Sequence, residues 1–189
     1  SSLYRVSYKG KADTSLSKID TTSSHAKARK TRHMLEAFHG QSDPKALDAA
    51  WPYLNDDDYH LRYASRIAIE WQDPKTWADK AYSEKDDLAA IHALLGLARS
   101  DLEGSLAPSV KRLLKVDFEK LDKMGKLALL RTYGVIMSRG GMPEAGQVKA
   151  IGDQLDPRFP AKDDNLNEEL CRVLCYLQHP SVVQKTIAL

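Results

Sequence analysis

The sequence predicts an all-α protein: a right-handed α-α superhelix of about five stacked helix pairs, preceded by a short extended N-terminal tail. Three observations predict this fold. The composition is rich in Ala, Leu, Lys, Asp and Arg and poor in β-branched runs, which favours helix over sheet. From residue 24 onward, apolar residues recur at helical spacing. Prolines recur at the start of the second helix in four of the expected pairs.

Residues 1–23 differ from the rest of the chain. Leu3–Tyr8 alternates apolar and polar residues, which predicts one short strand, and a polar stretch with turn chemistry follows Gly10. No second strand of comparable quality is available as a partner. Two compatible interpretations stay open: a disordered or loosely packed tail, or a strand whose sheet lies in another domain. We therefore expect a tail or linker over 1–23 and a helical repeat domain over 24–189.

Each expected pair joins a long helix to a short one. The long helices are expected at 25–39, 59–71, 86–99, 118–137 and 165–178, and the short helices at 44–54, 74–81, 106–114, 143–151 and 180–187. Ser23 or Ser24 is the expected cap of the first helix, which Gly40 should stop. Pro52 should kink or end the first short helix, and two prolines make 156–160 a loop.

The first two pairs contain an internal repeat. Asp43-Pro44-Lys45 and Asp73-Pro74-Lys75 lie 30 residues apart, and each follows a long helix. One amphipathic helix pair cannot bury its apolar face alone, but stacking on neighbouring pairs solves this. The spacing of about 30 to 40 residues is slightly short for HEAT or armadillo repeats. The Asp-Pro placement nevertheless favours HEAT-like units over the alternative, a non-repetitive helical bundle.

Charge and hydropathy narrow the class of protein. The formal net charge is +2, which predicts neither a nucleic acid nor an anionic membrane as partner. No run approaches the roughly 18 apolar residues of a membrane span, so we expect no membrane insertion. No signal peptide is visible, and because the chain begins without methionine we interpret it as a fragment or a processed product. Two cysteines do not make a disulfide framework, so they do not indicate whether the protein resides in an oxidising or a reducing compartment.

Cys171, Cys175 and His179 follow one another at intervals of four residues, so they could place three metal ligands along one helical stripe. A structural zinc site needs four ligands, usually from two elements, and no fourth is evident. His179 precedes a proline and should lie beyond the helix end. We therefore predict that both thiols are small core residues, with neither a disulfide nor a metal ion.

Several charged clusters have simpler explanations than a ligand site. The basic run Lys27–His33 largely avoids the apolar stripe of its helix and should be a solvated face. The acidic clusters should complement helix N-termini, since no calcium-loop pattern follows them. These clusters are Asp56, Asp57 and Asp58, then Asp86 and Asp87, and then Asp163 and Asp164. Arg62, Arg66 and Glu70 lie one turn apart, and we expect a partly buried Arg to fix the register with a neighbouring pair.

The sequence contains no Gly-rich phosphate loop, Gly-x-Ser-x-Gly, His-Glu-x-x-His or Cys-x-x-Cys-His motif. We therefore expect no enzyme activity and no catalytic, cofactor-binding or metal-binding residue in this segment. The alternative function is nucleic-acid binding by a helical-repeat protein similar to the alkylpurine DNA glycosylases, with Trp51, Trp71 and Trp77 in a concave groove. In the repeat, however, Trp77 matches Leu47 and Ala81 matches Trp51, which favours core packing for these rings.

Three segments resemble parts of large bacterial proteins of the sorbosone or quinoprotein glucose dehydrogenase-like type. Ser2–Gly10 resembles the final strand of their β-propeller, and Asp58–Glu70 and Asn167–Leu177 resemble helix motifs of the HEAT-repeat region that follows it. Together these segments cover about a fifth of the chain. The resemblance implies a central domain of a longer exported protein, periplasmic or secreted. The propeller's catalytic and cofactor-binding residues would lie upstream, and a cytochrome c haem would lie downstream.

These observations predict a non-catalytic scaffold or protein-interaction module within a dehydrogenase-like or cytochrome-like parent protein. Its partner would be a neighbouring domain or another protein. The short helices, including the segments around Lys45, Lys75, Lys111 and Lys149, are expected to line a concave surface that the partner contacts.

Overall fold

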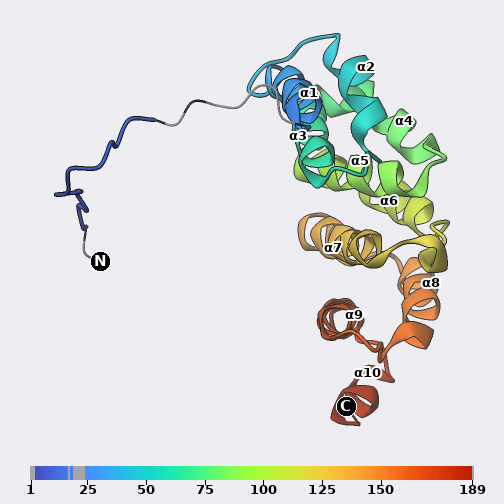
Figure 1. The fold of residues 1–189 in the computed structure, drawn as a ribbon. Coiled ribbons are helices and arrows are strands. Elements are labelled where there is room, and N and C mark those ends of the chain that lie inside the picture. The colour runs from blue at the N-terminus through green and yellow to red at the C-terminus, as the bar shows by residue number, and fades with distance from the viewer. Residues whose placement is uncertain (1–2, 17, 19–23, 189) are drawn as a thin grey trace.

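The computed structural model describes residues 3–16, 18 and 24–188, and these residues form ten α-helices and no strand (Figure 1). The prediction of an all-α protein is therefore confirmed. The long helices are α1 (Ala26–Glu36), α3 (Tyr59–Glu70), α5 (Asp87–Arg99), α7 (Lys123–Gly140) and α9 (Asp164–Tyr176). The short helices are α2 (Ala46–Ala50), α4 (Ala78–Ser83), α6 (Leu106–Leu113), α8 (Ala145–Leu155) and α10 (Val182–Ile187).

The helices form two rows in the order of the chain. Each long helix packs against the next long helix, from α1 through α3, α5 and α7 to α9, and the short helices α4, α6 and α8 touch one another more lightly. In Figure 1 the short helices run along the outer side of the curved array and the long helices along the inner side. The expectation that the short helices line the concave surface is therefore wrong, and the long helices take that place.

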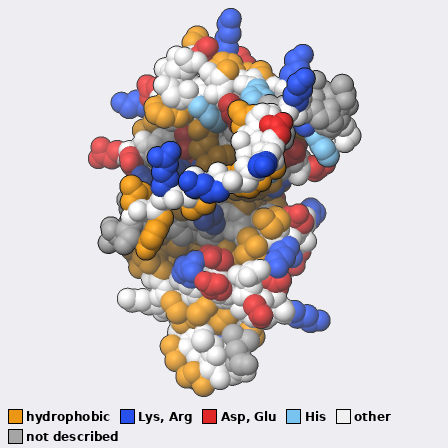
Figure 2. All heavy atoms as spheres, turned by 60° about the vertical axis from the view of Figure 1, so that its left-hand side comes forward, with side chains coloured by type: hydrophobic (Ala, Val, Ile, Leu, Met, Phe, Trp, Pro, Cys, Tyr) orange, Lys and Arg blue, Asp and Glu red, His pale blue; other side chains and the backbone are white. Residues whose placement is uncertain are grey.

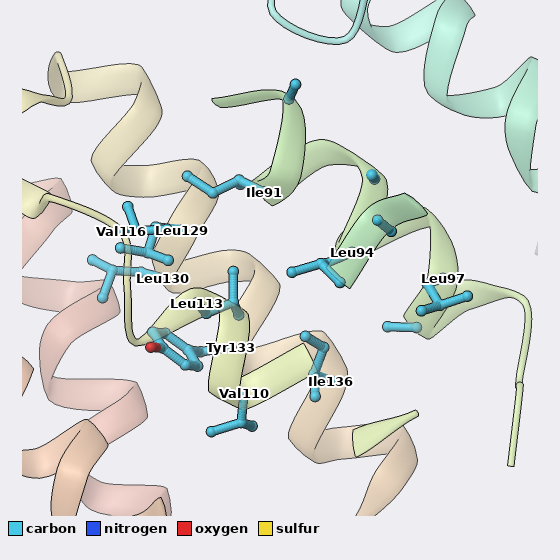
Figure 3. Close-up of a cluster of buried hydrophobic side chains, with 14 of the residues drawn as sticks. Ile91, Leu94, Leu97, Val110, Leu113, Val116, Leu129, Leu130, Tyr133 and Ile136 are labelled. Carbon is cyan, nitrogen blue, oxygen red and sulfur yellow. The ribbon is translucent and has the colours of Figure 1, made fainter. Parts of the chain in front are cut away.

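A continuous hydrophobic core lies between the two rows. It extends from Leu35 in α1 to Val182 in α10. Figure 3 shows its middle, to which α5 contributes Leu94, α6 contributes Leu113 and α7 contributes Tyr133. All three side chains are fully buried. No pair of helices has a core of its own, so burial of apolar surface ties each pair to the next.

The Asp-Pro repeat produces the same local geometry twice. An oxygen of the Asp43 carboxylate accepts a hydrogen bond from the backbone N–H of Lys45 at 2.8 Å, and Asp73 accepts one from Lys75 at 3.0 Å. The proline follows in a turn before α2 and in the 3₁₀ turn η2 (Pro74–Thr76) before α4. Short polar side chains satisfy backbone donors that have no partner within the helix, which is why Asp precedes these segments.

The first pair differs in part from expectation. The cap of α1 is His25, with no side-chain hydrogen bond, so the predicted cap Ser24 is wrong, and Ser23 lies outside the described residues. The helix ends at Glu36, and turns lead to Gly40, whose φ of 80° suits a residue without Cβ. As predicted from Pro52, the α-helical part of α2 stops early, and η1 (Trp51–Tyr53) continues it as a 3₁₀ turn.

Two later segments also differ from expectation. The single helix expected over 118–137 is divided into η3 (Phe118–Lys120) and α7, because Asp117 and Asp122 each cap a separate segment. The loop expected over 156–160 begins with one 3₁₀ turn, η4 (Asp156–Arg158).

The N-terminal tail is extended but is not a strand. Residues 3–9 have no regular secondary structure, and their side chains are exposed (Figure 1). The predicted strand over Leu3–Tyr8 is therefore wrong in this structure. A strand needs hydrogen bonds to a second strand, and no other extended segment among the described residues supplies them.

Candidate functional site

The first two turns of α3 carry a cluster of aromatic and arginine side chains, here called the α3 surface: Tyr59, Arg62, Tyr63 and Arg66. Tyr59 and Tyr63 are 53% and 49% exposed, and their rings stack with centroids 6.2 Å apart. The Arg62 guanidinium lies 5.9 Å from the Tyr59 ring centre and that of Arg66 lies 5.1 Å from the Tyr63 ring centre. These contacts are cation–π interactions that hold all four side chains in one arrangement.

The base of the α3 surface is fixed by hydrogen bonds. Arg62 donates from Nη1 to the backbone carbonyls of Asp56, at 2.5 Å, and Asp57, at 3.0 Å. The buried Arg66 pairs with Glu70 one turn later, and Glu70 also accepts a hydrogen bond from Arg99 Nε of α5 at 3.2 Å. Both Arg66 and Glu70 lie against Gly96 of α5, but the hydrogen bond to that helix is made by Glu70, which refines the expected register-setting role.

His92 of α5 lies near these arginines and adds no charge at neutral pH. Burial, together with the positive charges of Arg62 and Arg66, lowers its pKa to about 4. The imidazole is therefore neutral at pH 7. The positive charge of the α3 surface comes from its arginines alone.

Sequence reasoning missed Arg112 of α6, which ties this helix to the start of α5 and to the end of α4 in the preceding pair. Its side chain is buried, and its Nε donates to the carbonyl of Glu84 at 2.7 Å. Its Nη2 lies 2.9 Å from the Asp87 carboxylate at the start of α5. The Lys111-Arg112 dipeptide carried no distinguishing signal, because only the rotation of α6 decides which of the two side chains points inward.

The two cysteines do not lie where the sequence placed them. Cys175 is exposed and Cys171 is half-buried, so the prediction that both are core residues is wrong. The buried face of α9 consists of Leu170, Val173 and Leu174 instead. Burial and the neighbouring Cys171 thiol raise the pKa of Cys175. Within residues 3–16, 18 and 24–188, no three His, Cys, Asp or Glu side chains are grouped so as to hold a metal ion.

His179 belongs to a different cluster, between η4 and α10. Its Nδ1 lies 3.0 Å from Ser181 Oγ and 3.5 Å from Asp156 Oδ1, and the Ser181 hydroxyl donates to Asp156. Lys185 donates to the same carboxylate at 2.8 Å. In a catalytic triad, serine and carboxylate bond opposite nitrogens of the histidine, whereas here both face Nδ1. The cluster therefore joins the last two helix pairs and lacks the geometry that activates a serine.

Gly152 of α8 lets the His179 ring approach. A Cβ at this position would lie 2.7 Å from His179 Cδ2. We expect Gly152→Ala to lower the free energy of unfolding by about 1–3 kcal/mol, because the ring must move. Urea unfolding of Gly152→Ala, His179→Ala and the double variant measures this. The double variant should unfold like His179→Ala alone, and simple additivity of the two costs would contradict the explanation.

The Asp156 carboxylate should make stability depend on pH. Burial alone would raise its pKa, but hydrogen bonds from Lys185 and Ser181 outweigh burial and place the pKa below the ordinary value of 3.8. Stability from such a group is present above its unfolded pKa and is lost as pH falls through its folded pKa. Below about pH 4 we therefore expect the advantage of the wild type over Asp156→Asn to shrink. Urea titrations from pH 7 to pH 2 check this, and a constant difference would contradict it.

The remaining charged clusters agree with their structural explanations. Lys27, Lys30 and His33 are exposed, while Arg32 is half-buried and lies 3.1 Å from Glu36, so the solvated-face prediction is confirmed for most of this run. The acidic clusters cap helices as predicted. The carboxylates of Asp58, Asp86 and Asp163 accept hydrogen bonds from backbone N–H groups at the starts of α3, α5 and α9. The lysines expected on a concave face, Lys45, Lys75, Lys111 and Lys149, are exposed on the short-helix row.

The tryptophans are divided between core and surface. Trp51 and Trp77 are buried and meet edge to face with ring centroids 6.4 Å apart, as the packing interpretation predicts. The Trp51 indole N–H donates to Glu84 at 2.7 Å. Trp71 is 53% exposed. Two of the three rings therefore cannot stack on a nucleobase.

Comparison with known proteins adds no family. The chain matches no protein-family model, no curated protein and no solved structure. A search of the helices in the described part of the chain found none with the length and apolar character needed to cross a bilayer.

Proposed function

We propose that the chain is a non-catalytic scaffold or protein-interaction module, built as a HEAT- or armadillo-like right-handed superhelix. The observation that carries this proposal is the order of helix packing: each long helix packs on the next one along the chain. In repeat arrays each unit contacts only its neighbours, whereas a bundle around one centre brings distant helices together. By the resemblance of its helix motifs, the array would position domains within an exported dehydrogenase-like or cytochrome-like protein.

The α3 surface is the partner-binding site in this proposal. Tyrosine and arginine are enriched at protein interfaces, and held aromatic rings lose little conformational freedom on binding. Tyr59 and Tyr63 are half-exposed and already fixed by Arg62 and Arg66. Figure 2 shows basic, acidic and hydrophobic side chains intermingled on the long-helix side, which suits a protein partner better than a polyanion.

The test uses the domains that the parent gene encodes before and after this segment. Each domain is expressed separately, and its binding to the chain is measured by titration calorimetry. We expect saturable binding that Tyr59→Ala combined with Tyr63→Ala weakens by about 30-fold, the effect of a binding hot spot. Trp71→Ala is the control, since Trp71 is equally exposed but lies at the C-terminal cap of α3, outside the α3 surface. Absence of binding by every flanking domain, or equal losses in the two variants, would count against the proposal.

Nucleic-acid binding is tested in parallel. Short duplex DNA is titrated into the chain at low salt, where phosphate contacts are strongest. The scaffold proposal expects no saturable complex, because Trp51 and Trp77 are buried and the net charge is only +2. Tight, saturable binding would replace the scaffold with the nucleic-acid alternative.

A further inference from the structure

Cys171 and Cys175 form a thiol pair on the surface of α9. Both are free thiols, and their Sγ atoms lie 3.8 Å apart. Cys171 Sγ also lies 3.6 Å from Thr186 Oγ1 of α10. Cys171 packs against the edge of the core, but Cys175 is exposed, so core packing does not explain why a second thiol lies beside the first. The pair is independent of the α3 surface and of the proposed function.

The helix holds the two sulfur atoms in place. Asp163 caps α9 by accepting a hydrogen bond from the backbone N–H of Leu166 at 3.2 Å. Leu170 and Leu174, the residues that precede each cysteine, are fully buried and anchor the opposite face. Residues four apart in a helix lie above one another on one face. The thiols therefore start from a defined separation rather than from two mobile loops.

That separation fits a metal chelate better than a disulfide. A disulfide needs sulfur atoms about 2.0 Å apart and Cβ atoms about 3.5–4.5 Å apart, which stacking on an intact helix does not provide. Two thiolates bound to one tetrahedral zinc ion, each at about 2.3 Å, lie about 3.8 Å from each other. The sulfur separation in α9 is 3.8 Å. Little movement of either side chain is needed to bind such an ion.

We propose that Cys171 and Cys175 together bind one thiophilic d¹⁰ cation, such as Zn²⁺ or Cd²⁺, as a two-thiolate chelate on the surface of α9. Each thiol loses its proton to solvent when the ion binds. Soft thiolate ligands select such ions over Mg²⁺ or Ca²⁺. His179 takes no part, since α9 ends at Tyr176 and the His179 ring faces Ser181 and Asp156. Because Cys175 is exposed, water can complete the coordination of the ion.

Cadmium is the probe, because its bonds to thiolate produce a charge-transfer absorption that reports sulfur ligation directly. The chain is reduced, freed of small thiols and titrated with Cd²⁺. We expect saturable absorption in the wild type. Loss of one ligand removes the benefit of intramolecular chelation, so Cys171→Ser and Cys175→Ser should each weaken binding by roughly 10²-fold. Circular dichroism confirms that each variant keeps its helices.

The matched control is His179→Gln, which distinguishes a site made of the two thiols alone from a site in which His179 is a third ligand. The proposal expects unchanged Cd²⁺ affinity in this variant and reduced affinity in both cysteine variants. Weakening by His179→Gln would overturn it in favour of a three-residue site. An effect of only one cysteine substitution would overturn it in favour of a single reactive thiol, and absence of charge-transfer absorption in the wild type would overturn it outright.

Discussion

Replacing Arg112 with alanine is expected to lower the free energy of unfolding by about 3 kcal/mol, the lower end of the cost of breaking a buried ion pair. The Arg112 side chain is 7% exposed and that of Asp87 is 28% exposed. The substitution removes the charged partner of the Asp87 carboxylate, which keeps only a hydrogen bond from the backbone N–H of Asp117, and it removes the guanidinium donor of the Glu84 carbonyl. Urea unfolding followed by circular dichroism measures the change.

Arg139→Ala is the matched control for Arg112→Ala. Arg139 also pairs with an aspartate of another segment, Asp101, at 2.5 Å, but the two side chains are 44% and 71% exposed. Solvent screens such a pair, so its removal should cost at most about 1 kcal/mol. Equal costs at Arg112 and Arg139 would show that burial of the ion pair is not the source of its effect.

Truncating Leu94 to alanine is expected to cost about 2–5 kcal/mol, the range for leucine in a well-packed core. Leu94 is fully buried in α5, in the middle of the core drawn in Figure 3. The truncation opens a cavity between α5 and its neighbours, and surrounding helices relax only partly. The midpoint in urea should fall, while the slope of the transition stays unchanged, because the surface exposed on unfolding is the same.

Ile187→Ala is the comparison for Leu94→Ala. Ile187 is a large apolar residue on a helix as well, but it is 81% exposed in α10. Its truncation should change the free energy of unfolding by less than about 0.5 kcal/mol. A comparable loss at both positions would mean that these substitutions act through helix propensity or the unfolded state rather than through the core.

Much of the fold could be predicted from local signals. Asp73 followed by Pro74 specifies a cap and a turn within a few residues, and the repeat of this pattern at Asp43 made pairing of helices predictable. The acidic starts of α3, α5 and α9 were predictable for the same reason. A capping carboxylate acts on N–H groups two or three residues away, so no tertiary information is needed.

The functional surfaces depend on helix rotation and could not be predicted as well. Cys175 and Leu174 are neighbours in sequence, yet one is exposed and the other fully buried. A rotation of α9 by one residue would bring Cys175 to the buried position of Leu174, and apolar periodicity does not fix rotation so finely. The stacked pair of Tyr59 and Tyr63 did have a signal, since aromatic residues four apart share a face, but nothing in the sequence marked that face as exposed.

The long helices contact one another more extensively than the short helices do, and this difference bears on how the array bends. The long helices press on one another along the whole inner row, whereas the short helices α4, α6 and α8 touch only lightly. Bending that separates the short helices from one another breaks few contacts, whereas bending that separates the long helices breaks the more extensive contacts of their row. We therefore expect the array to bend more easily in the direction that separates the short helices than in the direction that separates the long helices.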